Sequence, residues 1–400
     1  MSSVSAEALA RPLTSEVAIS KSHAATRLES IDALRGLVIV LMALDHVRDY
    51  FTAADFDALD LSQTSFAYFM TRWITHLCAP TFIFLAGVSA YLMSKRMTTA
   101  ELRRFLMTRG LWLIALEFTV VHFAWSFNLR YQDGLFMQVI WAIGASMVVL
   151  ALIVSWPRWV IGLFAVGVIA THNLLDGIQP ETFGGWAPLW NLLHVRGRLA
   201  HAFVLYPLIP WVAVMALGFW AGAVFELQAS ARRRVLWASG IAALSLFVVL
   251  RAINIYGDPH AWETQSNVLL TALSFIKVHK YPPSLMYLLV MLGAACILLA
   301  ELEKMKGTLR QVLVVFGRVP LFVYVLHIVF AHLAAGLLAL ALGYGDALLT
   351  NIFIYKPEGW GFGLFGVYAA WLLIMIGLYP ACRWYGDLKR GRTQWWWGYL

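Results

Sequence analysis

Residues 27–51 read RLESIDALRGLVIVLMALDHVRDYF, an apolar stretch interrupted by charged side chains. An α-helix rises about 1.5 Å per residue, so Arg35 and His46, eleven positions apart, would lie about 16 Å from each other along one helix. Polar groups at such depths in a membrane are costly unless they face protein, water or a ligand. The stretch therefore predicts a membrane-spanning helix that carries functional groups, with the arginine near one face and the histidine deeper.

The composition extends this prediction to the whole chain. Hydrophobic residues make up 61% of the 400 residues and charged residues only 13%, whereas soluble domains contain roughly 25% charged residues. A bilayer span needs about 20 apolar residues, and the segments that qualify are 33–52, 66–93, 108–127, 135–155, 158–175, 202–226, 235–256, 284–301, 311–342 and 362–381. We expect an all-α fold, a polytopic transmembrane bundle of about ten helices.

No soluble domain of useful size lies outside these segments. Residues 1–28 are rich in Ser and Ala and predict a disordered cytoplasmic tail. Residues 29–385 form the expected transmembrane domain, and 386–400 a cytoplasmic C-terminal tail. The three cysteines lie in different apolar segments, which indicates neither a disulfide framework nor a thiolate metal site.

The distribution of basic residues predicts the orientation. With both termini in the cytoplasm, 21 of the 30 Lys and Arg fall on the cytoplasmic half and nine on the outer half, as the positive-inside rule requires. The pI of about 9.4 then follows from topology and gives no support for nucleic-acid binding. In this orientation ten of the eleven histidines, all except His23, fall on the outer half.

Helical spacing suggests partners for the polar groups of the first helix. Asp32 lies three residues before Arg35, and Asp49 three residues after His46, so each pair would share one helix face. A carboxylate beside an imidazole fixes its tautomer and raises its basicity. Asp49 and His46 therefore form a candidate general-base pair, with a solvated ladder of charges at the helix end as the alternative.

Other candidate site residues are spread along the chain. His76 lies one turn before Pro80 and would line an outward cavity or serve a structural role. The segment 311–342, which Pro320 should bend, repeats the pattern of an inner Arg318 and an outer His327. Four outer residues are candidates for substrate binding: Trp186 and Trp190, which would stack on a sugar or sit in the aromatic belt, and Lys280 and Tyr281 at the outer mouth.

Several motifs together carry a resemblance to a known family. RLESIDALRGLVIVLMALDHVRDYF, THLCAPTFIFLAG, YPLIPWVAVMALGFWAG, KYPPSLMYLLVMLG and GRVPLFVYVLHIVF occur in this order. The set is similar to the bacterial heparan-α-glucosaminide N-acetyltransferase-like family of membrane acyltransferases, and the resemblance spans nearly the whole chain. The resemblance implies an integral protein of the bacterial inner membrane that takes an acyl group, usually acetyl, from cytoplasmic acyl-CoA to a hydroxyl or amine of an extracytoplasmic glycan.

The resemblance assigns roles to the candidate residues. Arg35 and Arg318, with Asp32 beside Arg35, would hold the CoA phosphates, while His46 would deprotonate the acceptor or carry the acyl group itself. Asp49, His76 and His327 complete the candidate catalytic set. Acetyl-CoA is the expected donor, without a metal, since no motif has metal-ligand spacing.

Two other classes of protein share some of these features. A proton-coupled transporter of a small polar solute also needs buried polar groups and proline-broken helices, although no inverted repeat is evident. In a structural or sensory membrane protein the same groups would only specify packing. The acceptor and the choice between direct and ping-pong transfer stay open. So does the oligomeric state, for which a homodimer is one alternative.

Overall fold

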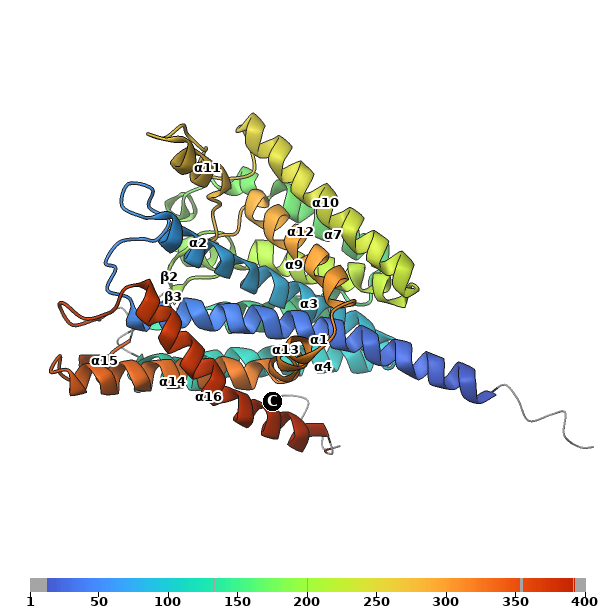
Figure 1. Ribbon diagram of the computed structural model, residues 1–400. Helices are drawn as coiled ribbons and strands as arrows, with labels where there is room; N and C mark the ends of the chain where they lie inside the picture. The colour runs from blue at the N-terminus through green and yellow to red at the C-terminus, as the bar shows by residue number, and fades with distance from the viewer. Residues whose placement is uncertain (1–12, 132–133, 200, 353–354, 391, 393–400) are drawn as a thin grey trace, which may run out of the picture.

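The computed structural model is a bundle of long helices with α1 running through it (Figure 1). It describes residues 13–131, 134–199, 201–352, 355–390 and 392, and only the backbone of 13–28. The helices are α1 (Leu13–Phe51), α2 (Phe66–Ile74), α3 (Cys78–Ser94), α4 (Thr99–Leu116), α5 (His122–Ser126), α6 (Val139–Ile153), α7 (Arg158–Thr171), α8 (Ala187–Leu193), α9 (Leu208–Ala221), α10 (Ala229–Ile253), α11 (Val268–Ile276), α12 (Leu285–Leu302), α13 (Thr308–Arg318), α14 (Pro320–Ala341), α15 (Ala347–Thr350) and α16 (Leu364–Arg390).

The predicted all-α bundle is confirmed, because each of the ten apolar segments contains a helix, although 135–155 and 202–226 each begin with a three-residue strand. Among the described residues, eight helical stretches are long and apolar enough to cross a membrane: Phe66–Ser94, Thr99–Ser126, Arg158–Leu175, Leu208–Glu226, Ala229–Ile253, Leu285–Leu302, Pro320–Ala341 and Leu364–Arg390. The other two segments correspond to α6 and α1. Helix α6 has only 15 residues. Helix α1 is 39 residues long, but residues 32–49 of it include five charged side chains.

The two predicted tails and the cytoplasmic orientation of the termini stay predictions. Residues 1–12, 391 and 393–400 lie outside the described residues, while helix α1 begins at Leu13 and α16 ends at Arg390. The first turns of α1 and the last turns of α16 point toward the same end of the bundle (Figure 1). This arrangement is the one that two termini on one membrane face require.

Prolines divide two of the long segments. Pro320 separates α13 from α14, as its lack of a backbone N–H predicts. The segment 66–94 tightens into a 3₁₀ turn at Thr75–Leu77 just before Pro80. The turn places Thr75 and Cys78 on the wall of a cavity described below.

A small sheet, which the sequence did not predict, lies among the loops at one end of the bundle. Strand β1 (Leu135–Met137) pairs in parallel with β3 (Ala202–Val204), and β2 (Gly197–Leu199) pairs antiparallel with β3. The carbonyl of Met137 then accepts hydrogen bonds from the backbone N–H groups of Leu205 and Tyr206 at 3.1 and 3.2 Å. The sheet thereby ties the chain just before α6 to the segment that leads into α9.

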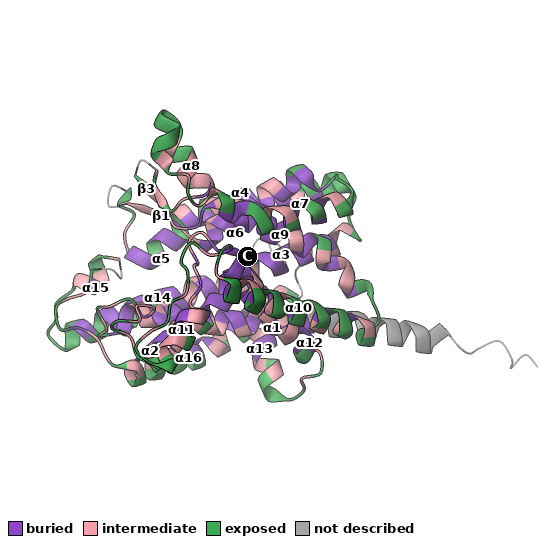
Figure 2. Ribbon diagram, turned by 90° about the horizontal axis from the view of Figure 1, so that it is seen from above, coloured by how far each residue is buried: buried purple, intermediate pink, exposed green. Residues whose placement is uncertain are grey.

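The core surrounds α1, which packs against α3, α13, α14 and α16. Seen from above, buried residues gather in the interior, where α3, α6 and α9 meet (Figure 2). The crossing of α1 and α13 is set by glycines: a Cβ added to Gly36 would stand 1.8 Å from the Leu313 carbonyl oxygen, and one added to Gly317 1.7 Å from that of Asp32. The two backbones are in direct contact, as small residues permit in membrane proteins.

The close contact between α1 and α13 predicts different effects on stability when two glycines are replaced by alanine. We expect Gly317→Ala to lower the unfolding free energy by about 1–3 kcal/mol, because the added methyl forces α13 away from α1. Gly167→Ala is the matched control, since no atom lies within 4 Å of a Cβ there, and the better helix propensity of alanine should leave stability equal or higher. Thermal unfolding in detergent measures both. Equal midpoints for the two variants would contradict the close contact.

Candidate functional site

Two cavities approach each other inside the bundle. The inner cavity lies beside Arg35 and holds about 320 Å³, and the outer cavity lies beside His46 and holds about 270 Å³. The names follow the predicted orientation. Met42, Val139 and Tyr324 line both cavities, so the two spaces are separated by a single layer of side chains.

Helix periodicity explains why this layer lies next to His46. Met42 precedes His46 by four residues on α1, and Tyr324 precedes His327 by three on α14, so each pair shares a helix face. Because α1 packs against α14, Met42 and Tyr324 form one level and the two histidines the next. Val139, the first residue of α6, closes the layer from a third helix.

His46 and His327 form a hydrogen-bonded pair. His46 Nδ1 lies 2.7 Å from His327 Nε2, and His327 Nδ1 lies 2.8 Å from the Val323 carbonyl oxygen. A carbonyl only accepts, so His327 carries its proton on Nδ1 and, as a neutral ring, accepts at Nε2. His46 must then donate from Nδ1. The network leaves His46 Nε2 with an unprotonated lone pair, the atom that a general base or a nucleophile needs.

The partner of His46 is thus a histidine rather than the expected Asp49. The Asp49 carboxylate accepts a hydrogen bond from Arg48 at 2.6 Å, and the His46 ring bonds to His327 instead. His327 comes from a helix 281 positions away. Asp49 still lines the outer cavity, where its position is that of a charge partner for Arg48.

A second ion pair lies in the wall of the outer cavity. Asp45 bonds directly to Arg72 from α2 and lies 3.2 Å from Arg48. With the Arg48–Asp49 contact, two carboxylates balance two guanidinium groups in a setting where an unpaired charge would be costly. The sequence interpretation did not include Arg72, although a charged residue inside the apolar segment 66–93 was the available signal.

Lys280 and Tyr281 line the same cavity as His46, as their prediction as substrate-binding residues requires. The Lys280 side chain is buried, with 8% of the residue exposed, and none of the ion pairs between described residues involves it. Burial alone would raise the pKa of the Tyr281 phenol, but the charges of Lys280 and Arg72 outweigh burial and hold that pKa below its ordinary value. Lys280 thus gives the outer cavity one ammonium group in addition to the two carboxylates and two guanidinium groups whose charges balance.

Three predicted residues lie elsewhere. His76 is buried, and its carbonyl accepts a hydrogen bond from Tyr287 at 2.7 Å, but its side chain lines neither cavity. Trp190 donates its indole N–H to the Ile178 carbonyl at 2.9 Å, and Trp186 is 72% exposed. Both tryptophans lie outside the two cavities, because the 176–201 loop folds partly on itself.

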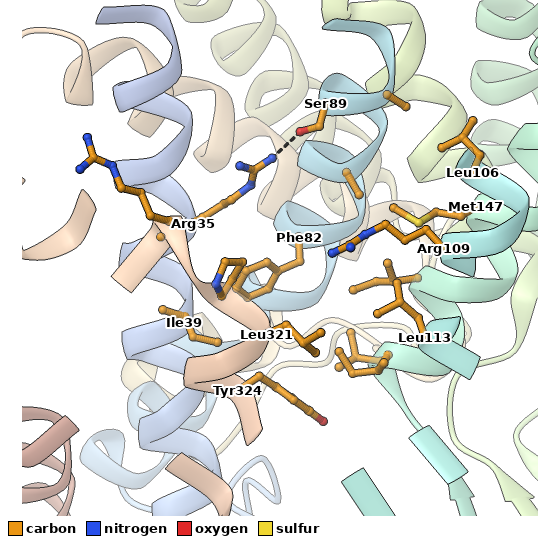
Figure 3. A pocket seen from close by; sticks show the side chains of 18 of the residues that line it. Arg35, Ile39, Phe82, Ser89, Leu106, Arg109, Leu113, Met147, Leu321 and Tyr324 are labelled. Carbon is orange, nitrogen blue, oxygen red and sulfur yellow. Dashed lines mark hydrogen bonds between the residues drawn. The ribbon is translucent and has the colours of Figure 1, made fainter. Parts of the chain in front are cut away.

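The inner cavity is apolar along its walls and cationic at its edges. Figure 3 shows Arg35 bonded to Ser89 at one end, Arg109 pointing into the space, and Tyr324 at the opposite end. Arg35 also bonds to Asp32 at 3.1 Å, and Arg318 lies 3.7 Å from Glu29. The remaining lining is mostly apolar: Ile39, Met42, Phe82, Ala86, Ala90, Met93, Phe105, Leu106, Leu113, Val139, Ile140, Ile143, Met147 and Leu321.

Two further cations line this cavity that the sequence interpretation did not name. Arg109 comes from α4 and Lys389 from α16, so four basic side chains from four helices surround one space. Only the packing of distant helices brings them together. Within the described part of the chain, no group of three metal-ligating side chains is close enough to hold a metal ion.

Comparison with known proteins adds one match. Residues 27–256 match the family model described as heparan-alpha-glucosaminide N-acetyltransferase, catalytic. No curated protein matches the chain. The matched segment contains Arg35, His46 and Arg72. Lys280 and Tyr324, which line the outer cavity, and His327, which bonds to His46, come from beyond it.

Proposed function

The chain belongs to the heparan-alpha-glucosaminide N-acetyltransferase catalytic family, a family of membrane acetyltransferases that use acetyl-CoA, and from this premise we propose how its two cavities serve one transfer. Acetyl-CoA enters the inner cavity from the cytoplasm, and a hydroxyl or amine of an extracytoplasmic glycan enters the outer cavity. The acyl group passes between them beside His46. The membrane would be the bacterial inner membrane.

The observation that carries this proposal is the single layer shared by the two cavities. An acyl donor and an acceptor that approach from opposite membrane faces must meet at one point, and Met42, Val139 and Tyr324 mark that point. The His46 side chain lines the outer cavity next to it, with Nε2 free to accept a proton. Holding both reactants there would convert a two-body reaction into an effectively unimolecular one.

The chemistry assigned to His46 is proton transfer or acyl transfer through Nε2. In direct transfer, Nε2 takes the proton of the acceptor O–H or N–H as the acceptor attacks the thioester carbon, and returns it to the departing CoA sulfur. In ping-pong transfer, Nε2 attacks the thioester first and the acceptor then displaces the histidine. His327 acts through His46 in both routes, so it is a positioning residue. Lys280 and Tyr281 would donate hydrogen bonds to acceptor oxygens.

The test of the proposal is release of CoA by the purified protein. Protein in detergent, supplied with acetyl-CoA and hydroxylamine as a small acceptor, should liberate free thiol faster than protein-free detergent. Acetyl-CoA added to only one side of proteoliposomes of known orientation identifies the donor face. No release above background would reject the acyltransferase proposal and favour the transporter of a small polar solute.

The inner cations give a separate prediction for donor binding. We expect Arg35→Ala to weaken CoA binding about tenfold or more, because a charge-assisted contact with phosphate is lost, while turnover at saturating acetyl-CoA changes less. Arg234→Ala is the matched control, an exposed arginine that lines neither cavity. Titration calorimetry with CoA measures both. Unchanged affinity in Arg35→Ala would leave Arg35 as a packing residue held by Asp32 and Ser89.

A further inference from the structure

Tyr324 occupies an unusual position between the two cavities. Its ring packs edge-on against His46, with centroids 6.0 Å apart, and against His327 at 5.8 Å. The residue is 2% exposed, and the Trp125 side chain is a polar neighbour of its buried hydroxyl. The indole N–H of Trp125 only donates, so the proton of the Tyr324 hydroxyl has no acceptor among the described residues. A buried donor without an acceptor costs about 1–3 kcal/mol. The position therefore calls for a partner that is not part of the fold.

The lining of the shared layer narrows the choice of partner. Among the described residues that line both cavities, Met42 and Val139 are apolar, so Tyr324 is the one that offers a hydrogen-bond donor. Lys280 and Arg72 line the outer cavity alone. A group that arrives through the inner cavity and stops beside His46 would meet the Tyr324 hydroxyl before it meets either cation. In the proposed reaction that group is the thioester.

We propose that Tyr324 is a catalytic residue whose hydroxyl donates a hydrogen bond to the thioester carbonyl oxygen of the acyl donor and stabilises the oxyanion formed there. The inference rests on the proposed function. A donor held in advance at the place where negative charge develops is worth most in a site that excludes water. The rings of His46 and His327 fix the phenol in that place, since all three side chains come from facing turns of α1 and α14.

The step balances as follows in direct transfer. The acceptor oxygen or nitrogen forms a bond to the thioester carbon, its proton moves to His46 Nε2, and the carbonyl π electrons move to the oxygen bonded by Tyr324. Collapse of this tetrahedral species re-forms the carbonyl and breaks the carbon–sulfur bond. The thiolate leaves and takes the proton from His46. Tyr324 keeps its own proton throughout.

The first experiment compares Tyr324→Phe with the wild type in acetyl-CoA turnover with hydroxylamine. We expect kcat to fall about 10²- to 10³-fold, as for loss of one oxyanion donor, while KM for acetyl-CoA and the thermal midpoint stay near wild type, because the ring contacts remain. Tyr379→Phe on α16 is the matched control, since Tyr379 lines neither cavity. A kcat for Tyr324→Phe within threefold of the wild type would overturn the inference.

A second experiment distinguishes a hydrogen-bond donor from a packing residue. Fluorinated tyrosines placed at position 324 keep the ring and make the phenol a stronger donor. Assayed at a pH at which they remain protonated, they should turn over acetyl-CoA at least as fast as the wild type, in contrast to phenylalanine. Fluorinated variants as slow as Tyr324→Phe would contradict the donor role. Absence of CoA release by the wild type itself would instead overturn the proposed function, and this inference with it.

Discussion

Replacing His46 by alanine should lower the rate of acetyl transfer from acetyl-CoA to a weakly acidic acceptor such as a sugar hydroxyl by about 10³-fold, within the range of 10²- to 10⁴-fold that a positioned general base contributes. The expectation rests on the hydrogen-bond network, in which His327 and the Val323 carbonyl leave His46 Nε2 as a free base beside the shared layer. CoA affinity should stay near that of the wild type, because the inner cations do not contact His46.

The controls for this prediction separate chemistry from folding. His260→Ala removes an exposed histidine that lines neither cavity, and its turnover should match the wild type. With hydroxylamine, which needs little help to lose a proton, His46→Ala should regain part of its activity if His46 is a base. If His46 carries the acyl group, mass spectrometry of the wild type incubated with acetyl-CoA alone should find acetylation at His46. Full turnover in His46→Ala would remove the residue from the mechanism.

The helices could be predicted from the sequence because, in lipid, an apolar segment must satisfy its backbone hydrogen bonds within itself, and an α-helix does so. Each of the ten apolar segments contains a helix, and Pro320 divides the ninth where its ring forbids a helical hydrogen bond. The small sheet could not be predicted, since β1 and β3 are three-residue strands more than sixty positions apart. Their pairing depends on loops that packing brings together.

The candidate site was likewise predictable within one helix but not between helices. Arg35 and His46 were predicted from one helix, where their depths follow from a fixed rise per residue, and both line cavities. Partners on other helices were not predictable, because helix spacing ranks only neighbours three or four positions away. It therefore suggested Asp49 for His46, whereas packing supplied His327 and the layer residue Tyr324 from α14.

The His46–His327 pair leads to the second large effect. We expect His327→Met to lower turnover about 10²-fold, because methionine fills similar space but cannot accept the Nδ1 proton of His46 strongly, so the ring can change tautomer and place a proton on Nε2. Hydrogen-bond partners that orient metal-ligating histidines typically contribute 10- to 100-fold, and we expect an effect of similar size for the partner of His46. In contrast, His327→Gln offers a carbonyl oxygen close to the former Nε2 and should recover most of the activity.

If His327 had only a structural role, His327→Met and His327→Gln should have similar activity, because methionine and glutamine have similar length. His332→Gln, five residues further along α14, is the matched control: His332 bonds to the Ala124 and Leu348 carbonyls away from both cavities, so its loss should affect stability more than turnover. Nitrogen NMR of labelled histidine reports the tautomer directly. His46 Nε2 should appear unprotonated in the wild type and in His327→Gln, and mixed in His327→Met. Equal activity and equal tautomer signals in the two His327 variants would show that the pair does not orient His46.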